Sequence, residues 1–438
     1  MVKTRKDIKI GCITLGCDKN RVDTEKMLFL LSDAGYKLVE DIEQSDVILI
    51  NTCAFIKAAK EEAIQNILMA GELKKASEKK IVVTGCFSTR YREEIVNDLP
   101  EVDVFLNIDE EKDIVDVVDN LFKIKEKYNC LNESRILTTP PHYAYLKIAD
   151  GCNKKCSYCA IPKIRGKYKS TPIETLKIEA QKLYESGVKE LILVAQDTTA
   201  YGIDLYNKLA IVDLLKELVK IDFWKIRLLY TYPELVTDEL LDFICKNKKM
   251  ARYLDIPLQH VNPRILKLMN RPSDFKKTQE LINKIRNMDE YIAIRSTFIC
   301  GFPTEKEEDS EELVKFVSNS LDYAGFFIYS KEEGTESYNI KEKVLKKDAK
   351  IRQTKCEKAQ VISTIKHQER LLDKEVEVIY EGIDFKRGKF IGRTEYCAPE
   401  IDTKVYFTSK IPLDIGNVYK VKITKIDFNL IGEVVSYE

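Results

Sequence analysis

The stretch GCNKKCSYC, residues 151–159, contains three cysteines with a C-x3-C-x2-C spacing, Cys152, Cys156 and Cys159. It follows the apolar segment 144–150, which we predict to be a strand. The cysteines then lie at the carboxyl end of a strand, where α/β folds place cofactors. No neighbouring Cys or His offers a fourth ligand. Three thiolates on a four-iron cluster leave one iron open, and we favour this interpretation over a zinc knuckle.

Strands and helical segments alternate from residue 144 onward, beginning with the strand that leads into this stretch. Six such units suit a parallel barrel, complete or partial. We therefore predict an α/β barrel core over residues 142–372, with its last helix ending near Leu372. The predicted strands are 144–152, 190–197, 225–233, 253–260, 292–303 and 323–330.

A second alternating block, residues 7–122, precedes this core. Strands that alternate with helices indicate a doubly wound parallel sheet. Residues 123–141 lack a clear period and end in Pro-Pro, so we interpret them as a linker. The strands predicted for the first block are 8–17, 46–53, 80–86 and 102–107.

Residues 373–438 contain short strands with turn residues between them and no helical pattern. Such a segment is typical of a small β-barrel. The five predicted strands are 374–382, 388–396, 402–409, 417–427 and 430–438.

The composition of the chain argues against several classes of protein. Its 438 residues include 71 Lys or Arg and 71 Asp or Glu, so no overall basic field indicates nucleic acid. No apolar run approaches the ~20 residues of a membrane span. The N-terminal apolar stretch breaks at Gly16 and leads into polar sequence, unlike a signal peptide. We expect a cytoplasmic protein with no membrane partner, in which the twelve cysteines stay reduced.

A second set of three cysteines is spread over residues 7–122. Cys17, Cys53 and Cys86 each end a predicted strand, in CITLGC, ILINTC and IVVTGC. Neighbouring strands lie ~4.8 Å apart and end at a common edge. We therefore expect these thiols to converge and to hold a second cluster with an open iron, the alternative being three separate buried cysteines. Cys12 lies on the first of these strands and should face the other way.

The cysteine spacing of residues 152–159, with Tyr158 before the last cysteine, resembles the signature of radical S-adenosylmethionine enzymes. The three blocks together resemble the methylthiotransferases over about residues 7–438, and among these the RimO type. The stretches that carry the likeness are TLGCDKNRVDTE (14–25), YLKIADGCNKKCSYCAIPKIRGKYKS (145–170), VAQDTTAYG (194–202), YLDIPLQH (253–260) and GRTEYCAPEID (392–402). The chain departs from the family pattern at Thr304 and Thr403, where Gly is usual, and at Cys397, where an acidic residue is usual.

The resemblance implies two [4Fe-4S] clusters on the two triads, with S-adenosylmethionine bound at the open iron of the first. One S-adenosylmethionine would yield a 5′-deoxyadenosyl radical and another would supply the methyl group. Sulfur delivered at the second cluster would be added to the β-carbon of an aspartate in small-subunit ribosomal protein twelve. The resemblance further implies a low-potential electron donor such as flavodoxin or ferredoxin, and substrate recognition by residues 373–438.

The resemblance also implies contacts to S-adenosylmethionine from strand ends of the core. Residues flanking the cluster loop would shelter the adenine, and an arginine would pair with the carboxylate unless it forms a structural ion pair. A glycine would let the backbone approach. We expect no protein general base, because the cofactors carry the chemistry. The predicted contact residues are Tyr158, Ile161, Gln196, Gln259, Arg295 and Gly301.

Three different functions remain compatible with the sequence. The nearest is a methylthiotransferase that acts on an N6-isopentenyl or threonylcarbamoyl adenosine of transfer RNA. Residues 373–438 hold ten Lys or Arg and twelve Asp or Glu, a net charge of −2, which favours a basic protein over RNA as the substrate. The second function is that of an electron carrier with two clusters, although carriers normally have fully ligated clusters. The third is that of a zinc-based RNA-binding module.

Overall fold

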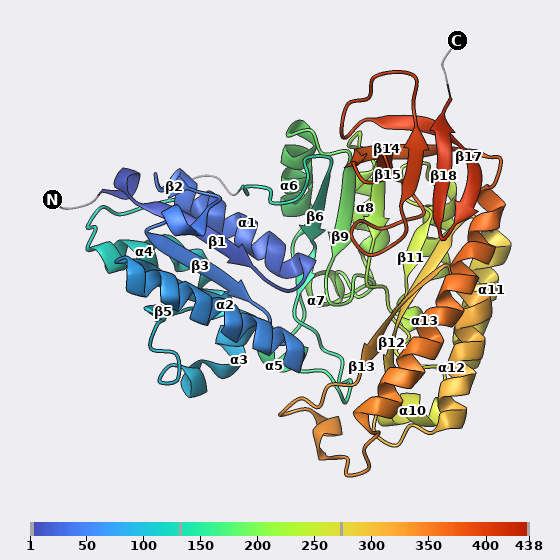
Figure 1. Ribbon diagram of the computed structural model, residues 1–438, viewed down its shortest axis with the longest axis horizontal. Coiled ribbons are helices and arrows are strands. Elements are labelled where there is room, and N and C mark those ends of the chain that lie inside the picture. Colours follow the sequence, from blue (N-terminus) through green and yellow to red (C-terminus); the bar gives the residue numbers. More distant parts are fainter. Residues whose placement is uncertain (1–3, 131–133, 272–274, 436–438) are drawn as a thin grey trace.

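The computed structural model describes residues 4–130, 134–271 and 275–435. The chain forms an N-terminal domain, a central core and a C-terminal barrel that covers one end of the core (Figure 1). This is the α/β architecture with a terminal β-barrel that the sequence predicted. Residues 131–133 of the predicted linker and 436–438 of the last predicted strand lie outside the described residues.

The N-terminal domain is a parallel sheet in the order β2-β1-β3-β4-β5. Val47 and Leu49 of β3 face helices α1 and α4, whereas Ile48 and Ile50 face α2 and α3. Because both faces are buried, β3 is apolar throughout most of its length. The sequence predicted four of these strands and missed the two-residue edge strand β2. The elements are β1 (Lys9–Thr14), α1 (Asp18–Asp33), β2 (Lys37–Leu38), β3 (Val47–Thr52), α2 (Lys57–Ala76), β4 (Lys80–Gly85), α3 (Cys86–Ile95), β5 (Val104–Phe105) and α4 (Ile114–Phe122).

The core is an arc of six parallel strands in the order β6-β9-β10-β11-β12-β13. Two three-stranded sheets make up the arc, and a bridge between Ile226 and Met250 joins them. All six predicted strands are present. They are β6 (Tyr143–Lys147), β9 (Glu190–Val194), β10 (Lys225–Leu228), β11 (Tyr253–Asp255), β12 (Ala293–Cys300) and β13 (Tyr323–Ile328), and a small antiparallel pair, β7 (Ala149–Asp150) with β8 (Lys169–Ser170), was not predicted.

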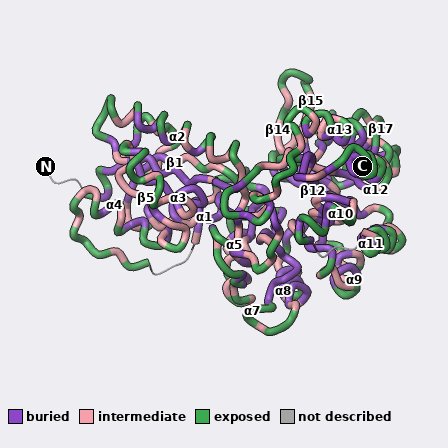
Figure 2. The backbone as a smooth tube through the Cα atoms, turned by 90° about the horizontal axis from the view of Figure 1, so that it is seen from below, coloured by how far each residue is buried: buried purple, intermediate pink, exposed green. Residues whose placement is uncertain are grey.

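Helices cover the outer face of this arc. Their apolar sides form one large core with the strands, and Figure 2 shows this interior as buried, with exposed backbone at the periphery. The helix α13 ends at Gln368, close to the predicted position. The core helices are α5 (Ile161–Ile164), α6 (Ile173–Glu185), α7 (Ile203–Tyr206), α8 (Ile211–Leu218), α9 (Asp238–Lys246), α10 (Pro263–Leu268), α11 (Phe275–Met288), α12 (Glu307–Ser320) and α13 (Lys346–Gln368).

The C-terminal domain is a closed barrel in the order β14-β15-β16-β18-β17. It sits at the amino ends of the core strands, the end opposite to the cysteine loop (Figure 1). All five predicted strands are present: β14 (Glu375–Asp384), β15 (Lys389–Arg393), β16 (Val405–Thr408), β17 (Val418–Asp427) and β18 (Asn429–Val434).

The loop 394–404, between β15 and β16, closes the floor of the core. Cys397 and Ala398 pack inside the arc among the first residues of three strands, Tyr143, Tyr253 and Tyr323. The Tyr323 hydroxyl lies 3.3 Å from Cys397 Sγ and is also in contact with Thr403. Cys397 and Thr403 therefore meet at one hydroxyl group.

Loop 394–404 also bonds to the other two domains. Asp402 accepts a hydrogen bond from Tyr253 at 2.6 Å and lies 3.5 Å from Nε of Arg295. Glu400 accepts a hydrogen bond from Tyr143 at 3.0 Å and pairs with Arg21 of α1 at 3.3 Å. This one loop therefore fixes the N-terminal domain, the core and the barrel relative to each other.

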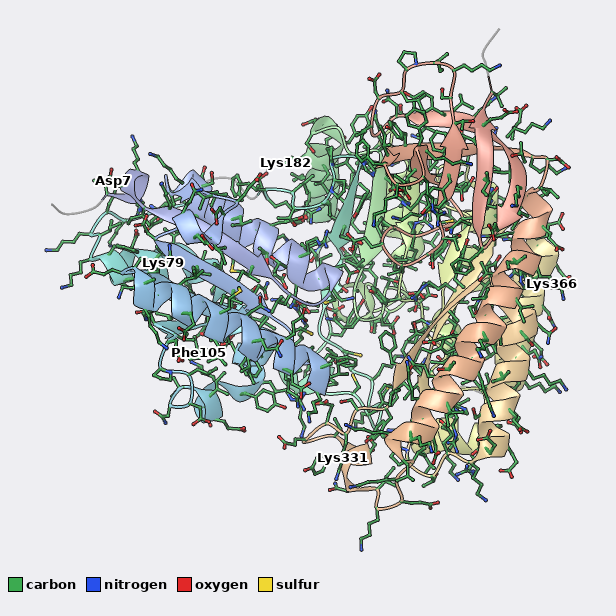
Figure 3. All side chains as sticks on the ribbon, in the orientation of Figure 1. Asp7, Lys79, Phe105, Lys182, Lys331 and Lys366 are labelled. Carbon is green, nitrogen blue, oxygen red and sulfur yellow. The ribbon has the colours of Figure 1, made fainter. Side chains whose placement is uncertain are left out.

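A second contact joins the N-terminal domain to the core at the opposite end of the strands. The loop after β13, marked by Lys331 in Figure 3, carries Glu332, whose side chain is 2% exposed. Glu332 pairs with Lys60 of α2 at 2.9 Å and with Arg90 of α3 at 3.1 Å. Loop 394–404 and Glu332 thus fix the N-terminal domain against the core at opposite ends of the core strands.

Candidate functional site

The first cysteine triad, Cys152, Cys156 and Cys159, lies between β7 and α5 at the carboxyl ends of the core strands. Gly151 opens the loop with φ of +73°, and a Cβ there would collide with the Lys167 carbonyl group, so the turn requires glycine. Ser157 N donates to the Met269 carbonyl at 2.9 Å, which ties the loop to the end of α10. The backbone thus fixes where the three thiols point.

Positive charge borders the first triad. Arg271, 5% exposed, places Nη1 4.0 Å from Cys156 Sγ, and its guanidinium lies 3.9 Å from the centre of the Tyr232 ring. The Tyr232 hydroxyl is itself 3.2 Å from Cys156 Sγ. Burial raises the pKa of Cys159 to about 12, the other two thiols act in the same direction, and Arg271 opposes them. A nearby cation favours the thiolate form that metal binding needs.

The second triad lies where β1, β3 and β4 end. Cys17 is the N-cap of α1, Cys53 follows β3, and Cys86 begins α3. Asn20 Oδ1 lies 4.0 Å from Cys17 Sγ and 3.8 Å from Cys86 Sγ. A Cβ on Gly16 would lie 3.2 Å from both Cys53 Sγ and Asn20 Nδ2. The structure therefore brings these three distant cysteines together around Asn20.

Burial and local dipoles act in opposite directions on the second triad. Burial raises the pKa of Cys86 to about 12, and Arg165 acts against this rise. Cys17 and Cys86 also lie at the amino ends of α1 and α3, where the helix dipole favours negative charge. Three thiolates in this position would thus have partial positive charge on several sides.

Neither triad has the geometry of a closed zinc site. Among the residues that the structure describes, which include all twelve cysteines, no three His, Cys, Asp or Glu side chains are close enough to hold one metal ion. A single zinc needs its sulfurs ~2.3 Å from one point. An iron-sulfur cluster gives each cysteine its own iron and accepts a wider spacing. The donor set in each place is three thiols, which suits a four-iron cluster with one open iron.

A buried polar network links the two triads. Helix α5 starts just after Cys159 and is followed by Arg165, whose Nη2 donates to Asn20 Oδ1 at 2.6 Å. The other side of the same guanidinium pairs with Asp150 at 2.7 Å, and Asp150 accepts from Gly151 N at 2.8 Å. The contacts run without interruption from the first cysteine loop to the centre of the second triad.

Three of the predicted cofactor contacts lie beside the first triad. Tyr158 packs against Met269 and Phe302, and burial raises its pKa. Ile161 begins α5 and is half-buried. Gln196 donates to Asp150 at 3.2 Å, and its buried Oε1 has no hydrogen-bond partner within the described ranges. An orphaned acceptor at a strand end is what a bound polar ligand would satisfy.

The other three predicted contacts have structural partners. Arg295 pairs with Asp255 at 3.1 Å and with Asp402, so the structural ion pair is present. Gly301, with φ of +75°, has no room for a Cβ because it lies against Ala349 of α13, which accounts for the glycine without a ligand. Gln259 has φ of +70° and joins β12 through a bridge to Phe298. Their contacts to S-adenosylmethionine stay predictions.

The sequence reasoning missed three residues that border the triads. Arg165 stands six residues after Cys159, inside a stretch that carries the family likeness, but no spacing rule gives it a role. Arg271 meets the cysteines only in the folded core. Asn20 did leave a signal: it stands three residues after Cys17 at a predicted helix start, and residues i and i+3 share one face of a helix.

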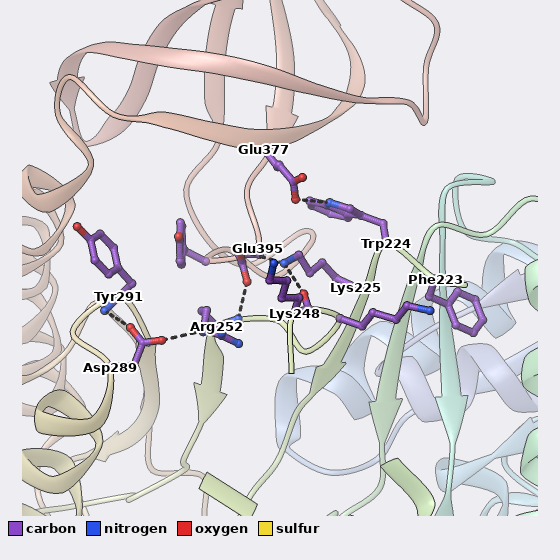
Figure 4. A pocket seen from close by; sticks show the side chains of 11 residues that line it. Phe223, Trp224, Lys225, Lys248, Arg252, Asp289, Tyr291, Glu377 and Glu395 are labelled. Atoms are coloured by element: carbon purple, nitrogen blue, oxygen red, sulfur yellow. Dashed lines mark hydrogen bonds and ion pairs between the residues drawn. The ribbon is translucent and has the colours of Figure 1, made fainter. Parts of the chain in front are cut away.

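Two cavities lie at the domain boundaries. One, of about 710 Å³, follows β1 past Cys12 and reaches Gly16 and Cys17, with the linker residues Thr138 and Thr139 on its other side. The other, of about 530 Å³, lies between the core and the C-terminal barrel (Figure 4). Most cations around the second cavity are paired, as Lys225 is with Glu395. Only the first cavity touches a triad.

Three family models match this chain in succession. They are described as Uncharacterized protein family UPF0004 at residues 9–107, Radical SAM superfamily at residues 146–317 and TRAM domain at residues 374–435. The first match contains the second triad, and the Radical SAM match contains the first triad. In the described residues no helix is long and apolar enough to cross a bilayer.

Several relatives are similar over nearly the whole chain. A protein of Caldanaerobacter subterraneus subsp. tengcongensis is 46% identical, with 97% of this chain and 99% of the relative covered. One from Thermoanaerobacter sp. is 44% identical with the same coverage, and one from Aquifex aeolicus is 43% identical with 97% of each covered. Each is named ribosomal protein uS12 methylthiotransferase RimO.

Solved structures resemble the chain in fold. The radical S-adenosylmethionine methyltransferase TsrM from Kitasatospora setae aligns with a TM-score of 0.56 at 12% identity, covering 73% of this chain and 72% of TsrM. The cobalamin-dependent S-adenosylmethionine radical enzyme OxsB aligns with a TM-score of 0.51 at 13% identity, covering 80% of this chain and 56% of OxsB. At such low identity these likenesses show the fold alone.

Proposed function

The chain belongs to the RimO family of radical S-adenosylmethionine methylthiotransferases, and from this membership we propose that it transfers a methylthio group to the β-carbon of an aspartate in ribosomal protein uS12. A [4Fe-4S] cluster and S-adenosylmethionine are the cofactors that the radical S-adenosylmethionine superfamily implies. The observation that carries the proposal is the pair of triads, each short of one ligand, which face a common domain boundary.

We assign the first triad to the cluster that binds S-adenosylmethionine and the second triad to an auxiliary cluster. When bound, the two clusters would supply the electron that cleaves S-adenosylmethionine and the sulfur that is transferred. The protein's own part is to hold both sites at a fixed separation. Arg271 and Tyr232 border Cys156, and Gln196 offers a free acceptor beside Asp150 for the polar part of the cofactor.

The substrate assignment is supported by the relatives and by charge. The close relatives carry the name of a uS12 enzyme. The C-terminal barrel has a net charge of −2 over residues 373–438, which suits a basic protein and would repel the phosphates of transfer RNA. The barrel lies at the amino ends of the core strands, opposite to the cysteine loop, so its charge would guide the approach of a basic partner and not contact the target aspartate. This attraction would fade beyond a Debye length of ~8 Å at physiological salt.

The electron donor is assigned by chemistry alone. The first cluster must be reduced one electron at a time at low potential, and a flavodoxin or a ferredoxin is the class of protein that can do this. Replacement of a chemical reductant by either protein, with product formation as the readout, tests this assignment.

The decisive experiment offers two substrates to the anaerobically reconstituted protein. A uS12 peptide with its target aspartate should gain ~46 Da, the mass of a methylthio group less one hydrogen, by the chemistry of the cofactors. Deuterium at the aspartate β-carbon should appear in 5′-deoxyadenosine. Transfer RNA with isopentenyl or threonylcarbamoyl adenosine should remain unchanged. Gain of the methylthio group by the RNA and not by the peptide would overturn the assignment.

A further inference from the structure

We propose that Arg165 is a positioning residue of the second triad: the core lends its guanidinium to the N-terminal domain, where it holds Asn20 and sets the electrostatic potential at the auxiliary cluster. This inference rests on the proposed function, because it takes the second triad to be a cluster site. It adds a specific cation that no cysteine pattern reveals. Three kinds of observation carry it: burial, hydrogen bonding and the charge balance around the guanidinium.

Arg165 is buried at the boundary between two domains. Its side chain is 2% exposed, although it belongs to the core and its partners Asn20 and Asp23 belong to α1. Nη2 donates to Asn20 Oδ1 at 2.6 Å and lies 3.1 Å from Asp23, while Nη1 pairs with Asp150 at 2.7 Å. A guanidinium fixed on both sides in this way has little freedom to move, since it presents five donors in a rigid plane.

The Asn20 side chain connects Arg165 to the second triad, because the orientation of its amide group is fixed. Its amide group donates to the carbonyl oxygens of Leu15 and Thr52, at 3.1 and 2.9 Å. Both amide hydrogens are therefore used, and Oδ1 must point toward Arg165 and the thiols of Cys17 and Cys86. Arg165 reaches the triad through this oxygen, which lies 4.0 Å from Cys17 Sγ and 3.8 Å from Cys86 Sγ.

The charges around Arg165 are balanced. Two cations, Arg165 and Lys147, share two carboxylates, Asp23 and Asp150, with Lys147 bonded to both. Asp150 lies 2.9 Å from Lys147 Nζ and 2.7 Å from Arg165 Nη1, so both cations pair with this one carboxylate. These four charges nearly cancel, and little water screens them. Loss of any one of them should therefore change the electrostatic potential at the second triad.

Arg271 provides a matched control at the other triad. It is as deeply buried, and its Nη1 lies 4.0 Å from Cys156 Sγ, yet within the described part of the chain it bonds to no residue of the N-terminal domain. If each arginine serves its own triad, substitution of one should alter one cluster and leave the other unchanged. A general loss of folding would affect both.

The test measures the reduction potential of each cluster separately, by anaerobic titration followed by electron paramagnetic resonance. Cys53→Ala and Cys156→Ala backgrounds isolate the first and the second cluster. Arg165→Gln should lower the potential of the second cluster, because a positive charge is lost, and Asp23→Asn should raise it. Arg165→Lys should lie close to the unmodified protein. Arg271→Gln should shift the first cluster alone.

Catalysis gives a second readout. Arg165→Gln should reduce methylthio transfer ~10–100-fold, the range seen for groups that orient metal ligands, with kcat changed more than KM. Cleavage of S-adenosylmethionine should fall less than methylthio transfer, because Arg165 reaches the first cysteine loop only through Asp150. Equal loss of iron from both triads, or shifts of the same sign in Arg165→Gln and Asp23→Asn, would overturn the proposal. These potentials are measured without substrate, so failure to modify uS12 would count against the proposed function and not against the role of Arg165.

Discussion

The two cysteine triads are assembled by opposite means. The first lies in one loop of the core, and neighbouring turns such as the one at Gly151 hold its shape. The second joins three strand ends that are distant in the sequence, and only the register of the sheet brings them together. A local site survives small errors in the fold around it, whereas a site made by a sheet edge fails when any one strand shifts.

The strongest test of this contrast is Cys156→Ala. It should abolish both S-adenosylmethionine cleavage and methylthio transfer, because the first site starts the reaction. The unmodified protein should hold about eight irons after reconstitution and the variant about half of these, as expected for two four-iron clusters. Iron and sulfide analysis, with 5′-deoxyadenosine measured in parallel, checks this outcome. Zinc alone in anaerobically reconstituted protein would contradict it.

Cys53→Ala should have a narrower effect. It should lose the iron of the second triad and all methylthio transfer, yet still release 5′-deoxyadenosine under reductant, because Cys53 lies in the other domain. Product masses separate the two activities. Equal loss of cleavage in Cys53→Ala and Cys156→Ala would show that the triads do not act separately.

The dependence of the second triad on strand ends can be tested without touching a cysteine. Gly85 precedes Cys86 with φ of +90°, and a Cβ there would collide with Asn51 and the Thr52 carbonyl. Gly85→Ala should destabilise the domain by about 3 kcal/mol or more and empty the second triad only. Gly187→Ala, with φ of +100° and open space around the Cβ, should cost only about 1 kcal/mol and leave both triads loaded. Urea unfolding and iron content measure both.

The stability of the domain that holds the second triad should also depend on pH. Burial and the nearby Asp23 raise the pKa of Glu111 to about 8, and its carboxylate accepts a hydrogen bond from Thr84 at 2.9 Å. Since the folded chain keeps a proton that the unfolded chain loses, this group's stabilisation should fall by about 1 kcal/mol per pH unit between pH ~5 and 8, then level off. Glu111→Gln should flatten the slope in unfolding experiments. An unchanged slope would contradict the assignment.

The smallest expected effect lies away from both triads. Thr304 adopts φ of +71° and is held by hydrogen bonds from Arg264 to its hydroxyl and carbonyl groups. A β-branched residue in this conformation is strained, so Thr304→Gly should raise the free energy of unfolding by about 1 kcal/mol. Cluster content and methylthio transfer should not change. A loss of activity would show that the loop around Thr304 contributes to the reaction in addition to the two triads.

The sequence predicted the parts of the molecule that repeat a local pattern. The strands that carry Cys17, Cys53 and Cys86 were predicted from apolar runs, and the strand edge placed the three thiols together. It missed β2 and the β7–β8 pair, because strands of two residues show no period. It also missed Arg165 and Arg271, since a cation that meets its partners through tertiary packing has no signature in spacing. The sequence could not decide whether Arg295 pairs with the cofactor carboxylate or forms a structural ion pair. Its pairing with Asp402 depends on a loop from another domain.

Loop 394–404 also determines the order in which parts of the molecule can be completed during synthesis. During synthesis both triads and Arg165 leave the ribosome long before Glu400 and Asp402, which belong to the last domain. Until then the amino ends of the core strands have no cover, and the buried Glu190 and Arg227 lack their partner Arg393 and the carbonyl of Glu395. The residues of both triads are therefore present in a nascent chain whose core strands still lack their cover, and the barrel domain supplies it.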